Sequence, residues 1–292
     1  MRNNLIGVIA FLLYTTNTLI CAVPIISGSV LKLIPIRLWQ KLISSILDNC
    51  ATTWVTINTW IQRITCRTRL QVTQHGTLTD KDWYLVIANH QSWVDILVLQ
   101  RVFNRKIPFL KFFLKRELIW VPVLGLAWWA LDFPFMQRYS KAFLKKYPHL
   151  KGKDLETTRK ACEKFRFKPV SIMNFVEGTR FQSAKHKLQQ SPFNHLLKPR
   201  AGGIAFVLSS MGDQLHKLLD VTIHYPGGVP SFWDFICGKV KQINVDIKVL
   251  PISSHLHGNY FDNAQHREAF QNWLNQVWVD KDKKLLELSA KA

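Results

Sequence analysis

Residues 83–95 read WYLVIANHQSWVD, and this stretch decides how the fold is interpreted. The apolar run that ends before Asn89 is typical of a buried strand, and a polar turn follows it directly. Five residues along one helix is about 500° of turn, so His90 and Asp95 would not share a helix face. They can meet only if His90 lies in the turn before a helix and Asp95 lies in its first turns. Asn89 and Ser92 are suitable turn or cap residues for that arrangement.

A histidine beside a carboxylate is the arrangement that converts a substrate hydroxyl into a nucleophile. The imidazole accepts the proton, and the carboxylate fixes its tautomer and stabilises the cation that forms. The spacing of His90 and Asp95 therefore makes them candidate catalytic residues. The alternative at this point is a solvated turn in which the aspartate only caps a helix.

The composition indicates an anionic partner. The 292 residues carry a formal charge of +20, although 48% of them are hydrophobic. Between residues 101 and 200 lie 22 of the 39 Lys and Arg, beside 6 acidic residues. A phosphorylated substrate, an acidic lipid surface or nucleic acid would each suit such a region. The five cysteines are odd in number and form no CxxC pair, so we expect a reducing, cytoplasmic setting without a disulfide framework.

The first 66 residues differ from the rest of the chain. Residues 5–35 contain a single charge, Lys32, and are long enough to cross a bilayer or to lie in one leaflet as a bent hairpin. The basic residues that follow predict a retained anchor, with the bulk of the protein on the cytoplasmic side, rather than a cleaved signal peptide. Residues 36–66 have helical periodicity and are either core or an interfacial helix. We therefore divide the chain into membrane-anchoring helices at 1–66 and an α/β domain at 67–292.

Beyond residue 66, short apolar strands alternate with helical stretches. Candidate strands are 69–74, 83–88, 107–110, 131–136, 170–175, 218–224 and 243–250. Candidate helices are 92–103, 111–118, 140–147, 154–167, 200–211 and 262–278, with a long loop at 181–200. This alternation predicts an α/β fold with a mainly parallel sheet flanked by helices, and chemistry at the carboxyl ends of its strands.

Further motifs add candidate phosphate ligands. The stretch FVEGTR at 175–180 follows an apolar strand, where a glycine permits close backbone approach and Arg180 offers a guanidinium fork. Lys198 lies just before an apolar helical run, near a helix end suited to anions. Each of these could also be an ordinary turn or helix start. The spacing of His255 and His257 matches no metal-site pattern, and no P-loop, dinucleotide fingerprint or GxSxG elbow is present, so we expect neither a metal nor a bound cofactor.

The order of four blocks resembles one family. NHQSWVD at 89–95, KRELIWVPVLG at 115–125 with FMQR at 135–138, NFVEGTR at 174–180 and VTIHYPGG at 221–228 are similar to the glycerolipid acyltransferases, the 1-acylglycerol-3-phosphate acyltransferases. The resemblance covers roughly residues 65–230. Val176 stands where the family usually has a proline, and the fourth block lacks the usual proline after its valine run. Both departures resemble the branch of lysocardiolipin acyltransferases and a PlsC-like bacterial inner-membrane acyltransferase.

The resemblance implies a reaction and a set of roles. A lysophospholipid hydroxyl would attack the thioester of acyl-CoA or acyl-carrier protein, with His90 as general base and Asp95 orienting it. Four positions match the family's acceptor-binding residues: Arg138, Glu177, Gly178 and Arg180. We add Thr179 and Lys198 to them as candidate substrate-binding residues. The two arginines would hold the phosphate, while Glu177 would organise Arg180 or bind a glycerol hydroxyl. Lysophosphatidic acid is the default acceptor, and the expected location is a bacterial inner membrane with its anionic surface.

Two other classes of function remain open. One is a membrane-associated scaffold with the same fold and little catalytic activity. The other is nucleic-acid binding, which charge and aromatic content alone suggest. No recognition motif supports it, so we expect no nucleic-acid partner. An acyl-transfer assay separates the scaffold from the enzyme.

Overall fold

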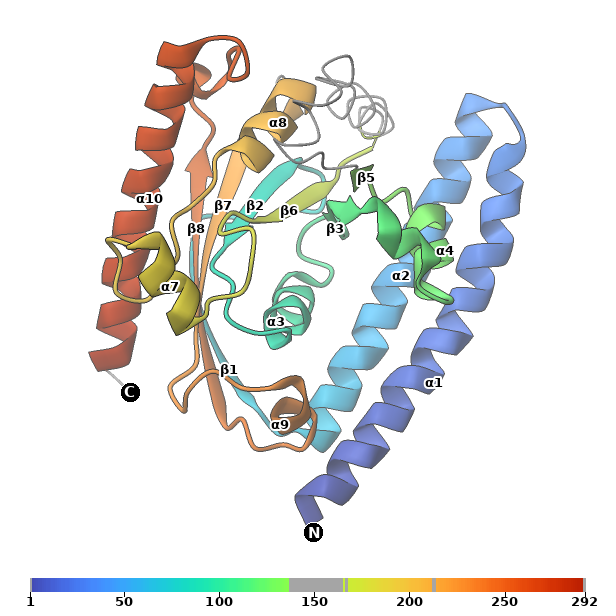
Figure 1. The fold of residues 1–292 in the computed structure, drawn as a ribbon. Helices are drawn as coiled ribbons and strands as arrows, with labels where there is room; N and C mark the ends of the chain where they lie inside the picture. The colour runs from blue at the N-terminus through green and yellow to red at the C-terminus, as the bar shows by residue number, and fades with distance from the viewer. Residues whose placement is uncertain (1, 137–164, 166–167, 212–213, 291–292) are drawn as a thin grey trace.

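The computed structural model describes residues 2–136, 165, 168–211 and 214–290 (Figure 1). The chain begins with two long helices, α1 (Arg2–Val30) and α2 (Arg37–Thr65), joined by the short 3-10 helix η1 (Leu31–Leu33). The two helices pack side by side as a hairpin. Polar side chains help to hold them together, because Asn17 donates to the Asn58 side chain at 2.8 Å in a buried position. The expectation of two N-terminal helices is confirmed.

A six-stranded sheet forms the centre of the molecule, in the order β1-β8-β7-β2-β6-β3. Its strands are β1 (Arg69–His75), β2 (Tyr84–Ala88), β3 (Leu110–Phe112), β6 (Ser171–Phe175), β7 (Lys217–His224) and β8 (Gln242–Pro251). Pairings are parallel except between β7 and β8, which are antiparallel. A separate small pair joins β4 (Leu114–Lys115) to β5 (Phe135–Met136). The predicted α/β fold with a mainly parallel sheet is confirmed.

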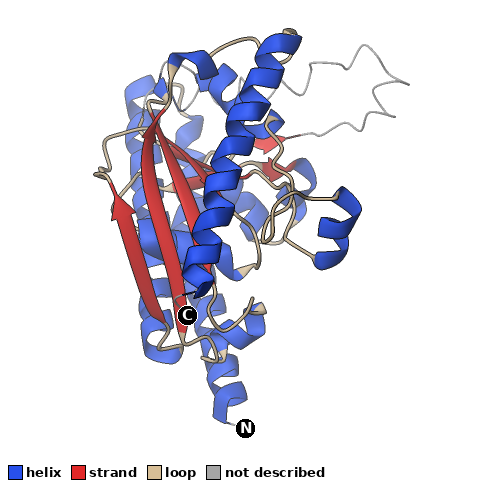
Figure 2. Cartoon of the chain, turned by 90° about the vertical axis from the view of Figure 1, so that its left-hand side faces the viewer, coloured by secondary structure: helices blue, strands red, loops and turns tan. Residues whose placement is uncertain are grey.

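Helices cover both faces of this sheet, and successive side chains of β2 enter different cores. Tyr84 and Val86 pack with α3 (Val94–Phe103), α9 (Phe232–Ile236) and the beginning of α1. Leu85 and Ile87 pack on the opposite side with α8 (Gly202–Met211) and α10 (Ala264–Ala290). This alternation is the period of two expected of a strand buried on both faces. Figure 2 shows α10 lying across its face of the sheet.

The α1–α2 hairpin lies on the α3 side and is attached to the body at both ends of α1. Gly7 packs so closely on α9 that a Cβ there would approach the Cys237 sulfur to 2.4 Å. At the other end, Lys32 forms an ion pair with Asp132 at 2.6 Å, just after α4 (Leu124–Ala130). Apolar side chains of α1, α2 and α4 also form a small core of their own. The hairpin therefore runs along the body rather than projecting from it.

The main error in the predicted elements concerns residues 111–118, for which a helix was expected. The structure has the end of β3, strand β4 and the 3-10 helix η2 (Arg116–Trp120) instead. A lysine at position 111 does not suggest a buried strand in the sequence. In the structure its ammonium group is nevertheless buried and donates to the Leu131 carbonyl. A short helix α7 (Ser183–Gln189) interrupts the expected loop at 181–200, and α4 and α9 were not predicted. The expected helix at 140–147 lies outside the described residues, as does all of the expected helix at 154–167 except Phe165.

Candidate active site

His90 lies in the turn between β2 and α3, and Asp95 lies in the first turn of α3. The Nδ1 of His90 is 2.9 Å from Asp95 Oδ2. The same oxygen accepts the backbone N–H groups of Gln91 and Ser92, which fixes the carboxylate at the helix start. Because a carboxylate accepts, Nδ1 carries the proton and Nε2 is the basic nitrogen. The sequence prediction that the two side chains meet across a turn and a helix start agrees with this geometry.

Asp95 has a second partner that the sequence did not reveal. Tyr225, in the middle of the fourth block, donates its hydroxyl to the other carboxylate oxygen, Oδ1. Burial, and then the negative charge of Asp95, raise the pKa of Tyr225 well above its ordinary value, so it stays a neutral donor. Asp95 is completely buried, whereas the His90 side chain keeps 11% exposure. The arrangement leaves His90 Nε2 without a hydrogen-bond partner among the described residues and able to accept a proton.

The ring of His90 is also held from one side. Phe175, the last residue of β6, stacks on the imidazole with centroids 3.9 Å apart and planes 13° from parallel. The Phe112 ring lies behind it, 6.3 Å from Phe175. Stacking fixes the plane of the imidazole, while the bond to Asp95 fixes its rotation within that plane. Phe175 opens the FVEGTR stretch, so the first and third blocks meet in direct contact.

Glu177 occupies a different place from the one expected. Its side chain is fully buried, and its two oxygens accept the backbone N–H groups of His90 and Leu197, both at 2.9 Å. Within the described part of the chain, no hydrogen bond or ion pair joins it to Arg180. Burial raises the pKa of Glu177 to about 7, although the two backbone bonds and the Lys281 charge oppose that rise. In this geometry Glu177 holds the backbone of His90 rather than the side chain of Arg180, and its binding of the acceptor stays a prediction.

The turn after Glu177 brings the other residues of the third block to the surface. Gly178 adopts a φ of +70°, which favours glycine, and a Cβ there would lie 3.5 Å from the Arg200 side chain. Thr179 accepts a hydrogen bond from Lys185 at 2.6 Å. The Arg180 guanidinium lies over the ring of Trp93, 4.7 Å from its centroid. Trp93 is 56% exposed, so this stack forms part of the surface beside His90.

Two candidate residues remain, Arg138 and Lys198. Arg138 lies outside the described residues. Lys198 is exposed and follows Leu197, so its backbone is close to Glu177, but its side chain lines a groove against α10. The structure thus brings His90, Asp95, Gly178 and Arg180 together at the carboxyl ends of β2 and β6. Lys198 lies in the adjacent loop.

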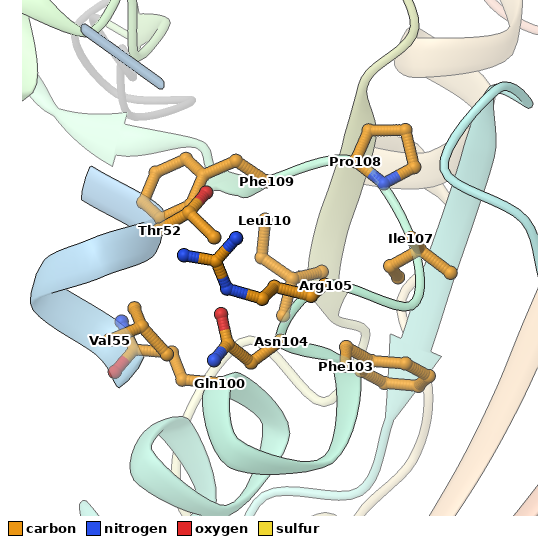
Figure 3. Close-up of a pocket in the computed structure, with 10 residues that line it drawn as sticks. All are labelled: Thr52, Val55, Gln100, Phe103, Asn104, Arg105, Ile107, Pro108, Phe109 and Leu110. Carbon is orange, nitrogen blue, oxygen red and sulfur yellow. The ribbon is translucent and has the colours of Figure 1, made fainter. Parts of the chain in front are cut away.

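A small pocket between α2, α3 and the start of β3 is a separate feature (Figure 3). Apolar side chains such as Val55 and Phe103 line it beside the polar groups of Asn104 and Arg105. Its volume of about 20 Å³ is roughly that of a single water site, too small for a lipid chain. His90 is not among its lining residues, so this pocket is not the candidate active site.

The family model for acyltransferases matches residues 69–225, more than half of the chain. The chain belongs to that family. The matched segment contains the His90–Asp95 pair and the whole FVEGTR turn, and it ends at Tyr225. The hydrogen bonds and ring contacts of His90 and Asp95 described above therefore lie inside the segment that the family model matches.

Individual relatives agree with that assignment at low identity. The mouse 1-acyl-sn-glycerol-3-phosphate acyltransferase epsilon is 23% identical over 246 residues, or 75% of this chain and 62% of the relative. The mouse gamma form is 23% identical over 300 residues, covering 94% of this chain and 75% of the relative. An uncharacterized acyltransferase of Schizosaccharomyces pombe is 27% identical over 218 residues, 68% of this chain and 58% of that one. The chain thus spans between about half and three quarters of the length of these relatives.

A solved structure has a similar fold. The 1-acyl-sn-glycerophosphate (LPA) acyltransferase PlsC of Thermotoga maritima aligns with a TM-score of 0.53, covering 99% of this chain and 98% of that one. Sequence identity in this alignment is 14%, so the similarity concerns the fold. It includes the N-terminal helices, since almost the entire chain is aligned.

Proposed function

We propose that this acyltransferase moves a fatty acyl group from the thioester of acyl-CoA or acyl-carrier protein to the free hydroxyl of lysophosphatidic acid or a related lysophospholipid. The observation that carries the proposal is the His90–Asp95 pair, in which Nδ1 is bound to a buried carboxylate and Nε2 is free. Family membership supports acyl transfer, and the names of the relatives point to a lysophosphatidic acid acceptor.

In the proposed mechanism, His90 Nε2 removes the proton from the acceptor hydroxyl as its oxygen attacks the thioester carbonyl. Asp95 stabilises the imidazolium that forms, and Tyr225 holds the far oxygen of that carboxylate. The tetrahedral intermediate then collapses, the C–S bond breaks, and the imidazolium returns the proton to the leaving thiolate. No covalent acyl-enzyme is required, because the acceptor oxygen is itself the nucleophile.

Arg180 is the proposed ligand of the acceptor phosphate, together with Arg138. Arg180 is half-buried, has no anionic partner among the described residues, and is oriented by Trp93. A guanidinium that lies over an aromatic ring keeps its N–H groups free at its edge, and it can therefore donate two parallel hydrogen bonds to a phosphate. Gly178 adds no side chain to the turn, so a ligand can approach its backbone closely.

We further propose that the α1–α2 hairpin lies in the membrane interface, at the cytoplasmic face of a bacterial inner membrane. One helix, Arg2–Leu33, is long and apolar enough to cross a bilayer, with 28% of its most apolar window buried. Its two ends nevertheless bind the body, through Gly7 and Lys32. Because a crossing helix would carry one end away from the body, a hairpin lying along the surface fits better.

The exposed apolar side chains of this hairpin support that arrangement. Those more than half exposed, on α1 and α2 and in the segment between them, are Leu5, Leu12, Leu19, Ile20, Val23, Val30, Leu33, Ile36, Leu38, Leu42, Trp60 and Ile64. Trp120 and Trp129, near α4, are exposed beside them at 85% and 51%. Such a patch far exceeds the scattered apolar residues of a soluble surface and includes the tryptophans typical of membrane interfaces.

The bacterial location and the lysocardiolipin-like branch rest on the departures at Val176 and at Thr222–Pro226. The headgroup of the acceptor is therefore the most specific part of the proposal. Lipid analysis of membranes with and without the protein, using lysophosphatidic acid and lysophosphatidylglycerol as competing acceptors, identifies the headgroup that is acylated.

The central test uses the purified full-length protein in phospholipid vesicles with radiolabelled acyl-CoA and lysophosphatidic acid. His90→Ala should reduce turnover by at least 10²-fold, which is the usual contribution of a general base. Asp95→Asn should do the same, while both variants still sediment with the vesicles. Normal turnover in His90→Ala would refute the proposed enzyme and favour the scaffold.

A further inference from the structure

A long groove on the α10 side of the sheet has no role in the mechanism above. It has a volume of about 680 Å³ and lies between α10 and the segment 192–199. One face of α10 lines the groove. Its residues Gln271, Asn275, Val279 and Leu286 are spaced by four or seven positions, so they lie on the same side of the helix. At 1.5 Å per residue the groove follows α10 for about 22 Å, so it suits an extended ligand.

The groove carries uncompensated positive charge. Lys198 on the loop and Lys283 on the helix are both exposed, and neither ammonium group has an ion pair with another described residue. The acid that lines the groove, Asp282, is already occupied. Its oxygens accept the backbone N–H groups of Asn194 and His195 at 2.8 and 2.9 Å. The two lysines are therefore available to an anionic ligand.

The loop that forms one wall of the groove also touches the active centre. Leu197 donates its N–H to Glu177, which holds the backbone of His90 through its other oxygen. Three residues later, the Arg200 side chain lies over Gly178. The segment 197–200 thus has the catalytic turn on one side and the groove on the other. The wall of the groove and the backbone of His90 are therefore joined through a single side chain, that of Glu177.

We propose that this groove binds the phosphorylated nucleotide end of a coenzyme A thioester, an inference that rests on the proposed acyl transfer. Lys198 and Lys283 pair with its phosphates. The side-chain amide NH2 of Asn275, which donates no hydrogen bond to another described residue, meets the purine beside the apolar Val279. The groove is on the sheet face opposite α1 and α2 (Figure 1). Lipid and donor therefore arrive from different sides, and the flexible pantetheine arm carries the thioester over segment 197–200 to His90.

The test combines a binding and a kinetic measurement on the full-length protein. Binding of free coenzyme A, which lacks an acyl group, is measured by calorimetry, with pantetheine and adenosine 3′,5′-bisphosphate as competitors. Acyl transfer is measured with palmitoyl-CoA and with palmitoyl-pantetheine as donors. The variant is Lys283→Glu, and the matched control is Lys81→Glu, an exposed lysine in the turn before β2.

Lys283→Glu should weaken coenzyme A binding and raise the KM for palmitoyl-CoA at least ten-fold, as expected for a lost charged hydrogen bond. The KM for palmitoyl-pantetheine should change less than two-fold, and adenosine 3′,5′-bisphosphate should displace coenzyme A. Equal effects on both donors, equal effects of the control variant, or competition by pantetheine alone would each overturn the inference. Transfer from acyl-carrier protein without any coenzyme A binding would also overturn it. Loss of all acyl transfer while coenzyme A still binds would refute only the proposed reaction.

Discussion

Replacing Glu177 with glutamine separates a positioning role from acceptor binding. Burial raises the pKa of this carboxyl from 4.5 to about 7, so at pH 8 its ionisation lowers the free energy of unfolding by about 3 kcal/mol relative to a carboxyl whose pKa does not change on folding. Glutamine removes that cost. It also turns an amide NH2 toward one of the two backbone N–H groups, and an unsatisfied buried donor costs about 1–3 kcal/mol. The two effects nearly cancel, so Glu177→Gln should fold with a stability close to that of the wild type.

Catalysis should respond differently. One of the bonds to His90 or Leu197 is lost, and the catalytic turn moves by a fraction of an ångström. Misplacement by about 1 Å can cost 10²-fold, so kcat should fall by about ten- to a hundred-fold while the KM for lysophosphatidic acid stays within two-fold. Steady-state kinetics in vesicles, at saturating acyl donor, measure both constants. A ten-fold higher KM with unchanged kcat would refute the positioning role and return Glu177 to the acceptor site.

The difference in stability between Glu177→Gln and the wild type should change with pH in a defined direction. Below about pH 4.5 Glu177 is protonated in both the folded and the unfolded chain. Between 4.5 and 7 the folded protein holds a proton that the unfolded chain has released, so stability from this group is lost as the pH rises through 7. Thermal melts should show Glu177→Gln gaining on the wild type as the pH increases over this range, and a constant difference would contradict the assigned shift.

Three further substitutions test neighbouring contacts. Tyr225→Phe removes the donor to the buried carboxylate of Asp95 and should lower kcat about ten-fold at unchanged acceptor KM; an unchanged kcat would show that the hydroxyl is dispensable. Trp93→Ala should raise the KM for lysophosphatidic acid about two- to five-fold because Arg180 loses its cation–π platform, and Trp93→Phe should recover part of the loss; equal defects in both variants would argue against stacking. Lys281→Met leaves the buried carboxylate of Asp220 without its ion-pair partner and should lower the free energy of unfolding by about 3–5 kcal/mol, measured by denaturant titration. A loss below 1 kcal/mol would show that other groups stabilise the Asp220 charge.

The sequence predicted the parts of the site that depend on local geometry. His90 and Asp95 are five residues apart within one turn and helix start, so their meeting follows from strand and helix periods alone. The strands at 84–88, 171–175 and 217–224 were also predicted to within one residue at each end, because apolar side chains recur through each of these short segments. In such cases each side chain is oriented by its own backbone neighbours.

Contacts between distant segments could not be predicted in this way. The resemblance led us to expect that Glu177 organises Arg180 or binds a glycerol hydroxyl, yet its hydrogen-bond partners in the structure are the backbones of His90 and Leu197. Backbone amides leave no signal in side-chain identity, so no motif could have revealed that bond. Tyr225 lies in the fourth block, but the sequence assigned it no role, because only the sheet order, with β7 next to β2, brings it to Asp95.

The first and third sequence blocks are one physical unit, which explains why they occur together. Four separate contacts fix His90, and three of them come from residues 175–181. Phe175 stacks on its ring, Glu177 accepts its backbone N–H, and Phe181 donates its N–H to the His90 carbonyl at 2.7 Å. Asp95 supplies the fourth through Nδ1. The HxxxxD spacing thus sets the tautomer of the base, whereas the FVEGTR turn sets its position, and the parallel pairing of β2 with β6 makes both act on the same residue. A substitution at a residue of either block that contacts His90 should therefore appear as a kcat defect of that histidine, whereas Arg180 and Trp93, which stack on each other, belong to the proposed acceptor site.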